Sequence, residues 1–197
     1  AVALANPGPR DPAVHAAMCA GTGGSTAASS LMAALAVGAG QYSGAREVLL
    51  AMGAWAECGN DLAAWRQRIA APPSEVPGIW PACEHPPGFD PHGVSTTTPV
   101  KQTLACLAGI SPGPHLRWLA AQRDALEAAA GLPLTMTGVA AAAFADLGLA
   151  PEEGEMLHLL LRLPGAAVHA LEQRVKGHKQ FPFFAMELQD DPAQEAA

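Results

Sequence analysis

The side chains that could do chemistry gather in two stretches of the sequence. Cys83, His85 and His92 place a thiol and two imidazoles in one segment, and these are the groups that zinc prefers. His169 and Glu172 are three residues apart, so they share one face if their segment is helical. That pair could bind a metal or act as acid and base, but the spacing favours a structural hydrogen bond. We expect no metal in either stretch.

Arg162 is the other candidate, because it lies in an apolar stretch that runs from Leu157 to Leu163. An arginine in such a stretch either binds the carboxylate of a ligand, pairs with a carboxylate of the protein, or extends its charged end into solvent. The sequence leaves these three roles open.

The elements that position these residues are predicted to be helices. Half of the residues (50%) are hydrophobic, only 5% are aromatic, and alanine is the main apolar type. Alanine favours helix and adds little volume, so the composition predicts an all-α fold of closely packed helices. A chain of 197 residues can bury one core, or one core and a smaller lobe.

Capping and stop signals divide the chain into helices. Asp11 followed by Pro12 predicts a helix start, and glycines after residues 20 and 37 predict helix ends. Pro164-Gly165 predicts a kink or a break in the last helix. The stretch 72–99 is rich in proline and glycine and is predicted to be a long loop. The predicted helices span residues 11–20, 25–37, 45–58, 61–70, 100–108, 114–130, 138–147 and 151–176.

Charge and cysteine content exclude some classes of function. The net charge is −7, and the 11 lysines and arginines form no basic cluster, which argues against nucleic acid as a partner. Residues 13–40 are apolar but consist mostly of small residues, so we expect a core helix and no membrane span. The four cysteines have no C-x-x-C spacing and lie among apolar residues, so we expect buried, reduced thiols and a cytoplasmic protein. No signal peptide is recognised at the first residues.

Residues 132–138 (LPLTMTG) and 162–173 (RLPGAAVHALEQ) resemble the citrate synthase superfamily. That family has a proline-containing turn with Asn-Val-Asp, an alanine-rich helix, and a helix reading Arg-x-x-Gly-x-x-x-His-x-x-Glu. Residues 38–47 (GAGQYSGARE) are similar to the family's Gly-Pro-Leu-His-Gly-Gly-Ala-Asn-Glu turn. The resemblance covers about residues 11–184 and implies a helical fold with acyl-CoA or citryl-CoA carbon–carbon bond chemistry.

The family's catalytic positions are substituted in this alignment. Thr137 stands where the family has its catalytic aspartate, and Tyr42 stands where it has the first catalytic histidine. The second histidine falls on Pro81, unless His85 takes its place through a rearranged loop. The resemblance therefore implies Tyr42, His85 and Thr137 as the catalytic positions, of which Tyr42 could still donate a hydrogen bond to an enolate.

The family's ligand-binding positions are partly retained. Arg162 matches the carboxylate-binding arginine, whereas His92 stands where the family has a second substrate-binding arginine. The resemblance implies a CoA thioester and a dicarboxylate as ligands, with no further cofactor. Glu84 and Asp90 are the nearest candidates for a relocated base. Without the standard triad, two functions stay open: residual chemistry of the family type, or a catalytically silent binding or regulatory homologue.

The resemblance also implies how the chain is organised. Residues 44–136 would form a small domain, while residues 1–43 and 137–197 would form part of a large helical domain. Family members are two-fold dimers, so a homodimer is expected. The alanine-rich segments 13–37 and 138–147 would allow close helix approach at such an interface.

Overall fold

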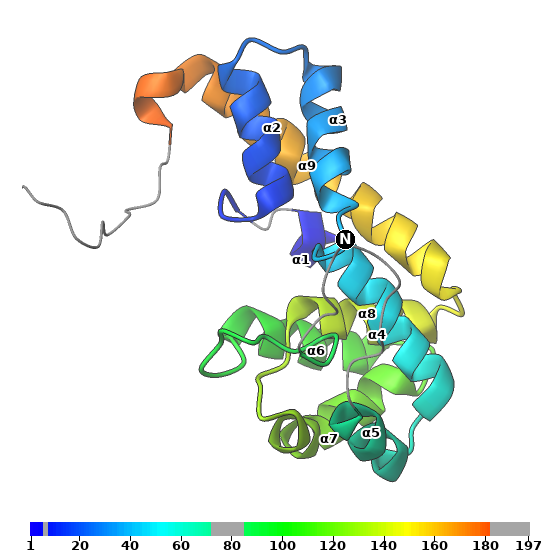
Figure 1. Ribbon diagram of the computed structural model, residues 1–197. Coiled ribbons are helices and arrows are strands. Elements are labelled where there is room, and N and C mark those ends of the chain that lie inside the picture. The colour runs from blue at the N-terminus through cyan, green and yellow to red at the C-terminus, as the bar shows by residue number, and fades with distance from the viewer. Residues whose placement is uncertain (6–7, 72–84, 182–197) are drawn as a thin grey trace, which may run out of the picture.

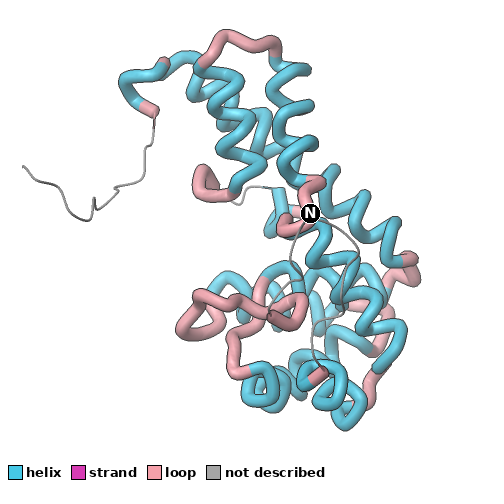
Figure 2. Tube along the Cα trace, viewed as in Figure 1, coloured by secondary structure: helices cyan, strands magenta, loops and turns pink. Residues whose placement is uncertain are grey.

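The computed structural model describes residues 1–5, 8–71 and 85–181, and its regular secondary structure is helical (Figure 2). This confirms the prediction of an all-α fold. The helices are α1 (Val2–Ala5), α2 (Pro12–Thr22), α3 (Ala27–Gly38), α4 (Gly44–Cys58), α5 (Leu62–Ala70), α6 (Thr98–Ile110), α7 (His115–Ala130), α8 (Met136–Asp146) and α9 (Pro151–Lys176), followed by the 3-10 helix η1 (His178–Gln180).

Side-chain caps begin several of the helices, and those of α2 and α3 lie at positions that the sequence predicts. Asp11 Oδ1 accepts hydrogen bonds from the N–H groups of Ala13 and Val14 at the start of α2. Thr26 caps α3 and Ser43 caps α4 in the same way. Each cap satisfies backbone donors that the first helical turn leaves without a partner. The starts of α2, α3 and α4 are therefore fixed by local sequence.

One buried cluster of apolar side chains lies among helices α4 to α8. Its centre is Trp55 of α4, whose ring meets Trp65 of α5 at 4.8 Å and Trp118 of α7 at 5.6 Å between centroids, in edge-to-face geometry. Aromatic pairs prefer this arrangement because ring edges are positive and ring faces negative. The alanines of α8 complete the cluster, and Ala141 and Ala142 are fully buried there.

A second buried cluster lies among α2, α3 and the C-terminal half of α9. It contains Val14, Ala17 and Met18 of α2, and Ala166 and Ala170 of α9. In Figure 1, α2 and α3 lie in the upper part of the view and α4 to α8 in the lower part. Helix α9 passes from one group to the other and, with 26 residues, is about 39 Å long. Both clusters therefore share this helix.

Pro164 does not break α9, so that part of the sequence prediction is wrong. The helix is continuous from Pro151 to Lys176, and Pro164 lies on its exposed side. The next residues, Gly165 and Ala166, are buried in the second cluster. Packing on both sides of the proline therefore holds the helix together although one backbone N–H is missing.

Two further predictions need correction. Cys19 and Cys106 are exposed, and of the described cysteines Cys58 alone is buried. Cys19 lies on the side of α2 that faces away from the core, since an amphipathic helix buries only one of its faces. The alanines of α8 are buried inside this chain, for example Ala142 at 0% exposure. The buried alanines of the segment 138–147 are therefore not available to a second copy. Cys83 lies outside the described residues.

Asp146, near the end of α8, holds the start of α7. Its carboxylate accepts hydrogen bonds from the N–H groups of His115 (2.7 Å) and Leu116 (3.1 Å) and from the Ser111 hydroxyl (2.5 Å). Burial raises the pKa of this carboxyl, but these hydrogen bonds outweigh burial and leave the pKa lowered. None of the described helices combines the length and the hydropathy needed to cross a membrane.

Candidate functional site

Glu47, in the first turn of α4, connects three segments that are far apart in the sequence. Its Oε1 accepts a hydrogen bond from the Gly88 N–H at 2.9 Å, and its Oε2 accepts one from the Thr137 hydroxyl at 2.8 Å. A carboxylate is also favoured at this place because the helix N-terminus carries a partial positive charge. The three segments are those in which the family resemblance places its catalytic residues.

Thr137 acts as a hydrogen-bond donor in this arrangement. A hydroxyl has one proton, and that of Thr137 is directed to Glu47. The Thr135 hydroxyl, 2.6 Å away, is then the donor to Thr137, which gives a chain of hydrogen bonds that ends on the carboxylate. Thr135 also caps α8 by accepting from the Gly138 N–H. Thr137 is thus fixed at the aligned aspartate position, but it cannot accept a proton near pH 7.

His85 lies next to the same carboxylate. Its Nε2 is 3.9 Å from Glu47 Oε1, and its side chain is 23% exposed. The distance is too long for a hydrogen bond but allows an ion pair when the imidazole is protonated. The structure therefore brings the predicted residues His85 and Thr137 together around Glu47.

A close backbone contact brings the His85 loop to α8. The Thr135 N–H donates to the Gly88 carbonyl at 2.9 Å, and the Asp90 N–H donates to the Pro133 carbonyl at 2.9 Å. Gly88 has φ +92°, and a Cβ there would be 3.0 Å from the Gly138 Cα. Glycine is required because this conformation and this contact both exclude a side chain.

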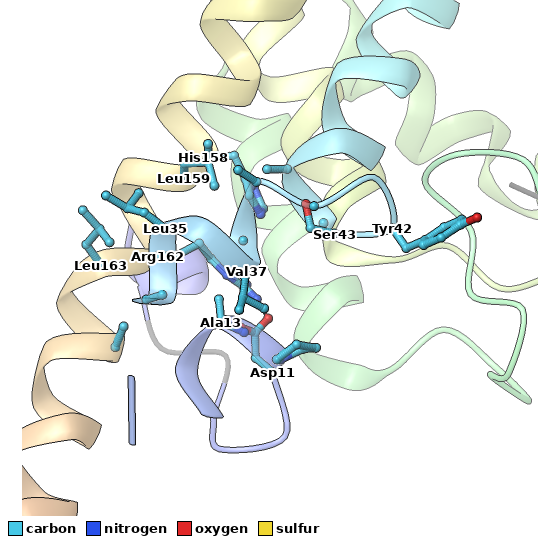
Figure 3. Close-up of a pocket in the computed structure, with 18 of the residues that line it drawn as sticks. Asp11, Ala13, Leu35, Val37, Tyr42, Ser43, His158, Leu159, Arg162 and Leu163 are labelled. Carbon is cyan, nitrogen blue, oxygen red and sulfur yellow. The ribbon is translucent and has the colours of Figure 1, made fainter. Parts of the chain in front are cut away.

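A cavity of about 530 Å³ adjoins this cluster, between α2, α3, the start of α4 and α9. Figure 3 shows His158 and Arg162 of α9 directed into it, with Asp11 approaching from the side of α2. The walls are mainly apolar, and the lining residues with polar side chains are Asp11, Gln41, Tyr42, Ser43, His158 and Arg162. Mainly apolar walls with a few converging polar groups are typical of small-molecule sites.

Arg162 is paired with Asp11 in the cavity wall. The guanidinium Nη2 donates to Asp11 Oδ2, while Asp11 Oδ1 caps α2. The side chains are 20% and 17% exposed. Of the three roles that the sequence left open for Arg162, pairing with a protein carboxylate is the one present. A ligand carboxylate would have to compete with Asp11 for the arginine.

His158 is the functional candidate that the sequence analysis missed. It is 2% exposed, and no residue in the described part of the chain hydrogen-bonds to its Nδ1. Burial, followed by the charge of Arg162, lowers its pKa to about 4, although Asp11 acts in the opposite direction. The imidazole is therefore neutral at pH 7. The signal that could have found it is its position four residues before Arg162, which puts both on one helix face.

Gly44 connects the cavity to the Glu47 cluster. A Cβ at Gly44 would lie 3.3 Å from Thr137 Cγ2 and 3.4 Å from His158 Nε2. Thr137 and His158 therefore lie against the same glycine, one from α8 and the other from α9. Gly44 therefore lies between the Glu47 cluster and the cavity.

The other predicted residues are distributed as follows. Tyr42 lines the cavity and is 57% exposed. His92 is exposed in a turn, where its N–H donates to Asp90 Oδ1 at 2.9 Å, and it does not line the cavity. His169 Nδ1 and Glu172 Oε2 lie 3.5 Å apart, within ion-pair distance, and do not line this cavity.

The remaining loop candidates, Pro81, Cys83 and Glu84, lie outside the described residues. Among the residues that the structure describes, no group of three or more potential ligands has the geometry to hold a metal ion. Because Cys83 lies outside the described residues, the expectation that Cys83, His85 and His92 hold no metal stays a prediction.

The arrangement of the helices is a citrate synthase-like fold. A solved structure with this arrangement is citryl-CoA lyase from Hydrogenobacter thermophilus, which superposes with a TM-score of 0.66 over 100% of this chain and 78% of that chain, at 16% sequence identity. No protein-family model matches the sequence, and a search of curated proteins gives no match. The fold predicted from the sequence is confirmed.

Proposed function

We propose that this chain is a ligand-binding protein of the citrate synthase-like fold in which the residues of carbon–carbon bond chemistry have been replaced. The observation that carries the proposal is the hydrogen bond from Thr137 to Glu47. In the family alignment the residue at 137 removes a proton from the acyl-CoA methyl group. A threonine hydroxyl that donates to a carboxylate cannot do this, and a lost base costs about 10²–10⁴ in rate.

The cavity next to this position supports a binding role. It has the size and the mainly apolar walls of a ligand site, and its polar side chains come from the cap of α2, the turn between α3 and α4, and α9. A CoA thioester and a dicarboxylate are the ligands that the resemblance implies. The related fold of citryl-CoA lyase makes citryl-CoA a further compound to test.

A turnover assay tests the proposal. The full chain is incubated with acetyl-CoA and oxaloacetate, or with citryl-CoA, and thiol release or thioester cleavage is followed at pH 7.5. We expect no turnover above the uncatalysed rate. Thiol release that depends on the enzyme concentration would refute the proposal.

A second candidate function is family-type catalysis with a relocated base. It is favoured by Glu47, a half-buried carboxylate with His85 Nε2 at 3.9 Å. If turnover is detected, Glu47→Gln should abolish it, because the amide has the same shape but cannot take a proton. Glu57→Gln, on the exposed surface of the same helix, is the matched control and should keep the activity.

We further propose that the chain forms a homodimer through α9. The exposed side of this helix carries apolar residues at helical spacing, namely Met156, Leu160, Val168, Leu171 and Val175, which are 51–89% exposed. A second copy would cover this face. Light scattering at micromolar concentration should give the mass of a dimer, and Leu171→Glu should give a monomer. A wild-type monomer would contradict the proposal.

A further inference from the structure

His158 presents an imidazole ring in the cavity wall, and its Nδ1 has no hydrogen-bond partner among the described residues. Nδ1 is almost completely covered, so a ligand in the cavity does not reach it. The ring nitrogen that lies beside the cavity-lining Gly44 is Nε2. A ligand atom that hydrogen-bonds Nε2 would gain affinity. The ring is therefore suited to a polar group of a ligand.

The polar end of the cavity has no net charge. Arg162 is compensated by Asp11 through their ion pair, and His158 is neutral because it is buried beside the arginine. A bound anion would have to displace Asp11 from Arg162 and leave that carboxylate without its partner in a partly buried place. Breaking such a pair is costly, since it leaves an uncompensated charge.

The rest of the cavity is apolar. Leu35 and Val37 of α3 and Leu159 and Leu163 of α9 form its walls. An apolar cavity of about 150 Å³ admits benzene, so a cavity of about 530 Å³ has room for a considerably longer aliphatic group. Burial of an aliphatic chain adds to the affinity with each methylene.

This inference rests on the ligand-binding role proposed above but replaces the anionic ligands that the resemblance implies. We propose that the cavity takes an uncharged, mainly aliphatic molecule with one amide, carbonyl or hydroxyl group that hydrogen-bonds His158. The aliphatic part lies along the leucine and valine walls. The polar group hydrogen-bonds the imidazole beside the Arg162–Asp11 pair. This ion pair disfavours charged ligands, because they would have to break it in order to bind.

Octanamide and octanoate test this inference, because they have the same size and differ in charge. Calorimetry at pH 7.5 on the full chain should give binding of octanamide, at least tenfold weaker binding of octanoate, and no heat with citrate. His158→Leu should weaken octanamide binding about five- to tenfold, the loss of one hydrogen bond. His158→Gln places an amide near the Nε2 position and should stay within about threefold of wild type. His178→Leu, exposed and outside the cavity, is the matched control.

A second variant tests the charge argument directly. Asp11→Asn keeps an N-cap residue on α2 but leaves the charge of Arg162 uncompensated. It should raise the affinity for octanoate about tenfold or more and leave that for octanamide nearly unchanged.

The inference is overturned if octanamide does not bind, if octanoate or citrate binds as tightly as octanamide to the wild type, or if His158→Leu leaves octanamide binding unchanged. These outcomes differ from failure of the proposed function, which is decided by turnover of acetyl-CoA or citryl-CoA. A preference for octanoate without turnover would refute the ligand class alone.

Discussion

Acidification from pH 7 to pH 5 should destabilise the protein through His158. The folded state holds this imidazole with a pKa of about 4, whereas its ordinary value is 6.5. As the pH falls below 6.5, the unfolded chain binds a proton on this residue, but the folded chain does not until about pH 4. The unfolded state therefore gains stability relative to the folded state across this window.

The magnitude follows from the two pKa values. Their separation of about 2.5 corresponds to about 3 kcal/mol over the whole window, at about 1.4 kcal/mol for each pH unit. About 2 kcal/mol of this should be lost between pH 7 and pH 5. The stability that the carboxylate of Asp146 contributes is lost only as the pH falls below the ordinary carboxyl range, because its folded pKa is lowered. The two contributions are therefore separated in pH.

Urea unfolding followed by circular dichroism at both pH values measures the effect. The free energy of unfolding of the wild type should fall by about 2 kcal/mol more than that of His158→Leu, in which the titrating group is absent. The exposed His178→Leu should keep the wild-type pH dependence. Equal losses in the wild type and His158→Leu would refute the claim that His158 is buried in its neutral form.

Two predictions concern the packing of α8. Ala142→Leu should overpack the cluster formed by α4 to α8 and lower the free energy of unfolding by about 1–3 kcal/mol, since Ala142 is 0% exposed. An unchanged melting temperature would mean that this position has space for a leucine. Asp146→Asn should cost about 1.5–3 kcal/mol in urea unfolding, because the hydrogen bonds to Ser111 and to the start of α7 lose their charged acceptor. A loss under about 0.5 kcal/mol would show that the charge contributes little there.

Local sequence predicted the helices well because their ends are determined by nearby residues. Asp11 and Ser43 cap α2 and α4 through groups two or three residues away. The predicted break of α9 at Pro164 was wrong because the effect of a proline depends on packing against α2 and α3. The local sequence contains no information on that packing. The exposure of Cys19 was missed because composition does not tell which side of a helix is buried.

The site was only partly predictable, since its contacts join distant parts of the chain. The resemblance marked Thr137 and Arg162, but their partners Glu47 and Asp11 are 90 and 151 residues away in the sequence. No sequence motif identifies such a partner. His158 belongs to no motif either, and its importance comes from the burial and the cavity that the fold creates around it.

The pairing of Arg162 with Asp11 also bears on how such a protein can change during evolution. The charge at the end of the cavity is decided by a residue of α2, while the arginine and the apolar walls on α9 stay the same. A single substitution at position 11 would therefore change the preferred ligand from a neutral molecule to an acid. No intermediate sequence with a disturbed fold is needed for this change. Among related chains that share α9, the residue at position 11 would be the first to change when the ligand changes. Comparing position 11 among such chains would therefore distinguish those that bind acids from those that bind neutral molecules.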